Sequence, residues 1–126
     1  MTSNVHSVEC ADSFRQLDHT EATYAYYMAR ASWEGSKVCW FQRSYEGPGL
    51  FVLLKLVFGR GIETLKQQSL EAGVTELQFT QFMAYSAAVF NNCGNFRSFG
   101  DTKFVPEFES AVFAKIFKAS SAYQTH

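Results

Sequence analysis

The sequence has little of what would direct a protein to a membrane or to nucleic acid. Eleven basic and twelve acidic residues leave a formal net charge of −1, so no basic surface for nucleic acid or an anionic membrane is expected. The longest apolar run, LFVLLKLVF at residues 50–58, is interrupted by Lys55 and is far shorter than the ~20 residues of a membrane span. We therefore expect neither a nucleic-acid partner nor a membrane partner.

Paired cysteines are also missing. The sequence contains an odd number of cysteines, namely Cys10, Cys39 and Cys93, and they show no C-x-x-C spacing. The first residues do not form the basic-then-apolar pattern of a secretion signal. Together these features predict a reduced, cytoplasmic protein.

The sequence templates of common catalytic and metal sites are absent as well. No H-E-x-x-H helix, paired C-x-x-C, G-x-S-x-G elbow, phosphate-binding loop or G-x-G-x-x-G fingerprint occurs. His6, His19 and His126 are scattered, and none lies within one helical turn of another histidine or cysteine. We therefore assign no catalytic residue, no metal ligand and no cofactor to this chain.

Apolar and aromatic residues, in contrast, are abundant. Hydrophobic residues make up 47% of the chain and aromatic residues 17%, which excludes a disordered protein. Thirteen Phe, six Tyr and two Trp exceed what one small core easily covers, because each ring needs about 150–250 Å² of cover. The 126 residues suffice for one core, and no repeat or linker divides them. We expect a single segment, residues 1–126, without an internal boundary.

Capping signals and apolar spacing predict five or six helices. DHTE and TELQ have the form of capping boxes and would begin helices near Asp18 and Thr75. The GPG at residues 47–49 fits the entry of a buried helix, and Gly35 and Gly73 fit helix ends. The segment 38–41 fits either a strand or, as we prefer, a helix. The expected helices cover about 11–17, 18–35, 50–58, 62–72, 75–91 and a terminal stretch after Pro106, with a strand as the rival interpretation of 50–58.

One apolar face stands out on the helix that begins near Asp18. Tyr24, Tyr27, Met28 and Ala31 recur at the spacing of one helical face. Such a stripe is typical of a face that packs inside the protein. A ligand-binding cage formed by Tyr24, Tyr26 and Tyr27 is the alternative interpretation of the tyrosines.

The stretch NNCGNFRSFGDTKFVP, residues 91–106, has two interpretations. In the first it is a structured loop, whose glycines adopt positive φ and whose phenylalanines fill gaps in the packing. In the second it presents Ser98, Phe99 and Gly100 to a ligand, with a ring for stacking and an open backbone for hydrogen bonds.

This stretch resembles a motif of the dipeptidyl peptidase III family of cytosolic zinc exopeptidases, N-x-G-N-[YF]-K-S-F-G-D-T-K-F-[VI]-P. TEATYAYYMARASWEG, GLFVLLKLVF and GVTELQFTQFMAYSAAVFNNCGN extend the resemblance upstream, so that it covers residues 8–119. Arg97 replaces the usual lysine of the family and keeps its charge. Phe96 replaces the commoner tyrosine and lacks its hydroxyl.

The resemblance implies a mainly α fold, namely an N-terminal helical segment of a larger, two-lobed metallopeptidase. Members of the family remove dipeptides from the N-terminus of short peptides. They hold zinc through an H-E-x-x-G-H helix and a downstream glutamate, and neither occurs in this sequence. The family's S-F-G loop, which contacts peptide in the substrate cleft, matches Ser98, Phe99 and Gly100.

We therefore expect the chain to form the side of the cleft that faces the zinc lobe, without a cofactor of its own and without activity alone. Its partners would be a short peptide and the remainder of the enzyme. The alternative is a stand-alone helical interaction module without catalysis, which docks a partner through its aromatic surface.

Overall fold

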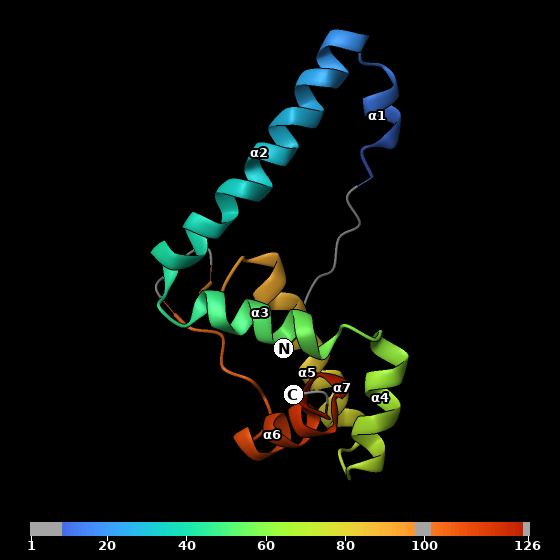
Figure 1. The fold of residues 1–126 in the computed structure, drawn as a ribbon, viewed down its shortest axis with the longest axis vertical. Coiled ribbons are helices and arrows are strands. Elements are labelled where there is room, and N and C mark those ends of the chain that lie inside the picture. Colours follow the sequence, from blue (N-terminus) through green and yellow to red (C-terminus); the bar gives the residue numbers. More distant parts are fainter. Residues whose placement is uncertain (1–8, 98–101, 125–126) are drawn as a thin grey trace. The chain divides into compact units, whose positions relative to one another are not determined.

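The computed structural model describes residues 9–97 and 102–124 and is mainly helical (Figure 1). These residues hold seven helices and no strand, so the predicted mainly α fold is confirmed. The number exceeds the expected five or six because a four-residue helix follows the terminal one. The helices are α1 (Ala11–Arg15), α2 (His19–Arg43), α3 (Gly47–Val57), α4 (Ile62–Glu71), α5 (Glu76–Asn91), α6 (Ser110–Ala119) and α7 (Ser121–Gln124).

The chain divides into two compact units, Met1–Cys39 and Trp40–His126. The first unit holds α1 and most of α2, and the second holds the end of α2 and the other five helices. That residues 1–126 form one segment without an internal boundary stays a prediction.

In the first unit, α2 begins at the predicted capping box. The Glu21 amide donates to Asp18 Oδ1 over 2.8 Å, and the Asp18 amide donates to Glu21 Oε2 over 3.0 Å. The predicted stop at Gly35 is wrong, because α2 continues through it to Arg43 and includes residues 38–41. A glycine inside a helix costs only about 1 kcal/mol, and Gly35 lacks the positive φ of a left-handed cap.

The predicted packing face of α2 is exposed. Tyr24 keeps 67% of its surface exposed and Tyr27 64%, and no residue of α1 or α2 is buried. The prediction that this stripe packs inside the chain is therefore wrong for the residues that the structure describes. A helical period identifies an apolar face but not the chain that covers it.

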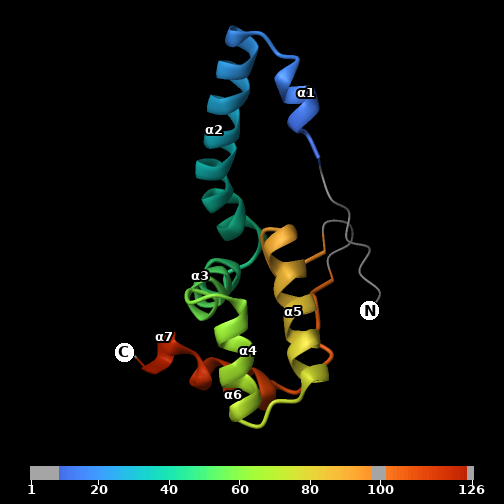
Figure 2. The same ribbon diagram turned by 90° about the vertical axis from the view of Figure 1, so that its right-hand side faces the viewer.

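The second unit has an aromatic core centred on Phe82 of α5, which is 1% exposed. Its ring lies 5.7 Å from that of Phe58, 5.8 Å from that of Phe113 and 6.2 Å from those of Phe79 and Phe108, measured between centroids. Figure 2 shows α4 and α5 side by side, and α4 also contacts α6. The other buried apolar residues are Leu54, Val57, Leu65, Val74, Phe79, Val89, Val112 and Ile116.

The turn between α4 and α5 agrees with the local sequence signals. Gly73 adopts a φ of 80° just after α4, as expected of a left-handed C-terminal cap. Thr75 Oγ1 accepts from the Gln78 amide over 3.2 Å, and Gln78 Oε1 accepts from the Thr75 amide over 3.0 Å. Both predictions are confirmed, and together they fix where α5 starts.

Candidate functional site

The predicted ligand-binding residues Ser98, Phe99 and Gly100 lie outside the described residues. The structure does describe the chain on both sides of them, residues 95–97 and 102–104, which we call the loop base. The loop base shows how the ends of the candidate site are held.

The two arms of the loop base are joined by backbone hydrogen bonds. The Arg97 amide donates to the Thr102 carbonyl over 3.0 Å, and the Phe104 amide donates to the Asn95 carbonyl over 2.8 Å. Between these bonds, Phe96 and Lys103 form an isolated antiparallel bridge, with Lys103 Nζ 5.3 Å from the centroid of the Phe96 ring. The ends of the intervening segment are thus held at a fixed separation.

Asn95 connects the loop base to the residues just before α3. Asn95 is only 6% exposed, and both the oxygen and the nitrogen of its side-chain amide form hydrogen bonds. Ser44 Oγ donates to Asn95 Oδ1 over 2.8 Å, and Asn95 Nδ2 donates to Glu46 Oε1 over 3.2 Å. Because a buried amide is costly unless it is satisfied, these bonds select one position for the first arm.

Glu46 binds the second arm through the same oxygen atom. Lys103 Nζ donates to Glu46 Oε1 and forms an ion pair with it. The hydrogen bond from Lys103, followed by that from Asn95, holds the pKa of the Glu46 carboxyl below its usual value. A single carboxylate oxygen therefore links both arms of the loop base to the start of α3.

A third tie comes from Arg43, the last residue of α2. Its Nη1 donates to the Asn92 carbonyl over 3.1 Å, and its Nη2 donates to the Arg97 carbonyl over 3.2 Å. The guanidinium thus bridges the C-terminal end of α5 and the first arm. At the turn between them Cys93 adopts a φ of 50° and Gly94 a φ of 154°, consistent with the predicted helix exit.

Close packing at Gly47 completes the support. The Gly47 amide donates to Ser44 Oγ over 2.9 Å, so the hydroxyl that holds Asn95 also receives a bond from the first residue of α3. A Cβ atom at Gly47 would lie 2.9 Å from that oxygen and 3.3 Å from the Trp40 carbonyl oxygen.

The charge of Glu46 also acts on Tyr85. Burial, and to a lesser degree the charge of Glu46, raises the pKa of the Tyr85 hydroxyl.

Sequence reasoning missed Ser44, Glu46 and Arg43 as supporting residues. All three lie about fifty positions before their partners, for example 51 positions between Ser44 and Asn95. No helical or strand period relates positions so far apart, and the adjoining GPG signals only a helix entry.

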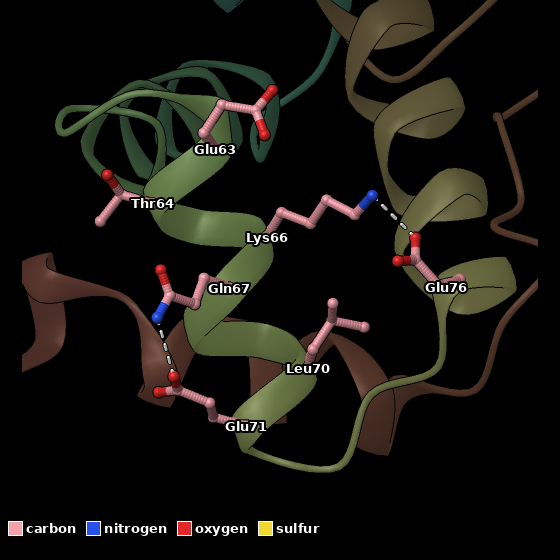
Figure 3. Close-up of a pocket in the computed structure, with 7 residues that line it drawn as sticks. All are labelled: Glu63, Thr64, Lys66, Gln67, Leu70, Glu71 and Glu76. Atoms are coloured by element: carbon pink, nitrogen blue, oxygen red, sulfur yellow. Dashed lines mark hydrogen bonds and ion pairs between the residues drawn. The ribbon is translucent and has the colours of Figure 1, made fainter.

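Two surface hollows lie elsewhere in the second unit. One, of about 500 Å³, is lined by α4 and the start of α5, where Lys66 points toward Glu76 and pairs with it over 2.9 Å (Figure 3). In the same view, Gln67 donates to Glu71 over 3.0 Å. The other, of about 530 Å³, is lined by Gln78, Gln81 and residues 106–109. Neither hollow is lined by a residue of the loop base.

The described residues do not form a site for the zinc that the dipeptidyl peptidase III family binds. Among residues 9–97 and 102–124, no group of three His, Cys, Asp or Glu residues comes close enough together to hold a metal ion. His6 and His126 lie outside those ranges, and His19 is the first residue of α2. Within the same ranges no helix combines the length and apolarity that crossing a bilayer requires.

No family model matches the chain. It is, however, 41% identical over 127 residues to dipeptidyl peptidase 3 of Nematostella vectensis and 39% identical over 123 residues to that of Homo sapiens. These matches cover 98% and 97% of this chain but 17% of each relative. Dipeptidyl peptidase 3 of Dictyostelium discoideum is 35% identical over 102 residues, which cover 81% of this chain and 14% of that protein.

The chain thus spans about 14–17% of the length of these curated relatives, consistent with the expected N-terminal portion. The similarity covers the helices and the loop base together, since nearly every residue of the chain is included. The resemblance seen in the loop motif is confirmed: over nearly its whole length, this chain is a relative of dipeptidyl peptidase 3 and corresponds to a portion of it.

Proposed function

We propose that this chain is the N-terminal, mainly helical portion of a zinc-dependent dipeptidyl peptidase 3 that removes dipeptides from the N-terminus of short peptides in the cytoplasm. In this proposal residues 1–126 act as one segment and form the side of the substrate cleft opposite the zinc. The observation that carries it is the 41% identity over 98% of the chain to a dipeptidyl peptidase 3.

The loop base supports a role for Ser98, Phe99 and Gly100 in binding the peptide. Hydrogen bonds donated by Arg43, and those that Glu46 accepts from Asn95 and Lys103, hold the two arms between which these three residues lie. A loop whose ends are already fixed loses less conformational freedom when a ligand binds, so less of the binding energy is consumed. An extended peptide would gain backbone hydrogen bonds there, as in strand addition, while the Phe99 ring packs on a side chain.

Zinc, when bound in the complete enzyme, would polarise the scissile carbonyl and activate water. The described residues of this chain supply no ligand group for it. We therefore assign peptide positioning to this chain and the hydrolytic step to the remainder of the enzyme. The chain alone is expected to be inactive.

A chimera tests this proposal. In it, this chain replaces the matching 123 residues of human dipeptidyl peptidase 3, with which it shares 39% identity. Release of dipeptides from a short peptide is then measured for the chimera and for the isolated chain, both with added zinc. We expect turnover by the chimera and none by the isolated chain. Chelator-sensitive release by the isolated chain would contradict the assignment of hydrolysis to the remainder.

The exposed rings of α2 also fit the alternative, a stand-alone interaction module. Sedimentation and thermal melting of the isolated chain distinguish the two. A monodisperse monomer that melts cooperatively favours the module. Aggregation and binding of a dye to exposed apolar surface favour a portion that needs the remainder of the enzyme.

A further inference from the structure

One side of α2 forms an uncharged stripe that the described residues of its own unit do not bury. Tyr24, Tyr27, Met28, Ala31 and Val38 fall within an arc of roughly 100° when successive residues are placed 100° apart around the helix. We call these five residues the α2 apolar face. All five are exposed in the structure.

The charges of α2 are kept off this face. Between residues 24 and 38 the charged side chains are Arg30, Glu34 and Lys37, and all three fall outside the arc. Lys37 pairs with Glu34, and the Arg30 guanidinium lies 5.9 Å from the centroid of the Tyr26 ring. The charged side chains of this stretch therefore lie and interact outside the arc, where the exposed Trp33 also lies, and within the arc the Tyr27 ring contacts that of Tyr26 edge-on.

The face is exposed over much of the length of α2. Tyr24 is 67% exposed, Tyr27 64% and Val38 58%, along a helix of 25 residues in which no residue is buried. Most of the stability of a helix in water comes from packing of its apolar face rather than from helix propensity. Contiguous exposed apolar surface marks interaction sites in proteins.

The centre of the face is shaped for another helix. Ala31 has a small side chain, and Gly35, which falls in the same arc, has no atom within 4 Å of where a Cβ would lie. Small residues between larger ones let a second backbone approach closely, while the flanking side chains interlock with it. The curated relatives contain further polypeptide beyond the matched portion, which is only 17% of their length.

We propose that the α2 apolar face is an interface with the remainder of the enzyme, covered by an amphipathic helix of that polypeptide. This inference rests on the proposed function. It adds to that function the surface through which this chain contacts the remainder of the enzyme.

The test compares two variants of matched exposure in the chimera with human dipeptidyl peptidase 3. Tyr24→Glu places a charge on the face, and Trp33→Glu places one about 180° around α2 at a side chain that is 68% exposed. We expect Tyr24→Glu to lower the Tm of the chimera by roughly 2–6 °C, with Trp33→Glu and the unaltered chimera melting alike. Val38→Glu, on the same face, should behave as Tyr24→Glu does.

The same substitutions in the isolated chain provide the second measurement. There Tyr24→Glu should leave the Tm and the helical circular dichroism unchanged, because Tyr24 is 67% exposed. Equal loss in chain and chimera would overturn the proposal, and so would equal loss for both variants in the chimera. A dimer of the isolated chain that Tyr24→Glu alone dissociates would also overturn it, in favour of a second copy.

The outcomes separate this inference from the proposed function. An unaltered chimera that releases dipeptides, together with no difference between Tyr24→Glu and Trp33→Glu, overturns the interface only. An unaltered chimera that releases none overturns the proposed function itself.

Discussion

Ser44 and Asn95 are 51 residues apart, yet the Ser44 hydroxyl donates a hydrogen bond to the Asn95 side chain over 2.8 Å. The same hydroxyl accepts from the Gly47 amide, and the same Asn95 amide group donates to Glu46. The bend before α3 and the first arm of the loop base are therefore held by one set of side chains. Substitutions in this set should change both the stability of the chain and the support of the loop.

Asn95→Ala should lower the free energy of unfolding by about 1–3 kcal/mol. Asn95 is 6% exposed, and its removal leaves the Ser44 hydroxyl without its acceptor and Glu46 without the hydrogen bond from the Asn95 side chain. Asn91→Ala, at the exposed last residue of α5, is the control and should change the stability little. Urea unfolding monitored by circular dichroism measures both. An equal effect of the two substitutions would contradict a supporting role for Asn95.

Gly47→Ala and Gly49→Ala should have opposite effects. A Cβ at Gly47 would lie 2.9 Å from Ser44 Oγ, and Pro48 further restricts a residue with a side chain before it, so we expect a loss of about 1–3 kcal/mol. Gly49 lies in the same helix with no atom within 4 Å of that position, and alanine there should add up to about 1 kcal/mol. Thermal melts compare the two, and stabilisation by Gly47→Ala would contradict the close packing at this glycine.

The ion pair of Glu46 should make stability depend on pH. The pKa of this carboxyl is lowered in the folded chain from a usual value of 4.5, mainly by the hydrogen bond from Lys103. Its stabilisation is therefore fully present above about pH 4.5 and is lost as the pH falls through the lower folded value. Glu46→Gln should melt below the unaltered chain at pH 7, and the difference should shrink toward pH 3. Glu9→Gln, at an exposed residue, is the control. A difference in Tm that stays constant over this range would contradict the prediction.

Phe99→Ala should weaken peptide binding by the chimera with human dipeptidyl peptidase 3. Loss of an aromatic contact in a partly exposed site costs about 1–2 kcal/mol, and this should appear mainly as a higher KM. Leu77→Ala, at an exposed position of α5, should leave KM unchanged. If Phe99→Ala leaves the kinetics unchanged, the Phe99 ring does not bind peptide and only fills a gap in the packing of the loop.

The helices could be predicted where the sequence signals are local. The capping boxes at Asp18 and Thr75 and the left-handed glycine at position 73 each act within a few residues, and each is found where expected. The prediction that α2 ends at Gly35 is wrong because a glycine ends a helix when the backbone turns into the left-handed region. Here the backbone does not turn, and the apolar residues after Gly35 continue α2. Whether the chain turns thus depends on the neighbouring residues as well as on the glycine.

The supporting residues of the candidate site could not be predicted in the same way. The motif in residues 91–106 identified the loop, but Glu46 and Arg43 act on it from about fifty residues earlier. That pairing arises only when α3 packs against α5, which is a property of the folded core. The exposure of Tyr24 and Tyr27 could not be predicted either, because periodicity does not tell which polypeptide covers a face.

The long sequence separation between the loop base and Glu46 determines when the loop base can be assembled. Lys103 must reach Glu46, 57 residues earlier, before both arms are held, and contacts across such distances form late because loop closure has an entropic cost. On a ribosome, α3 and α4 would leave the exit tunnel well before the second arm does. The residues proposed to meet the peptide thus gain their support only after most of this unit has been synthesised.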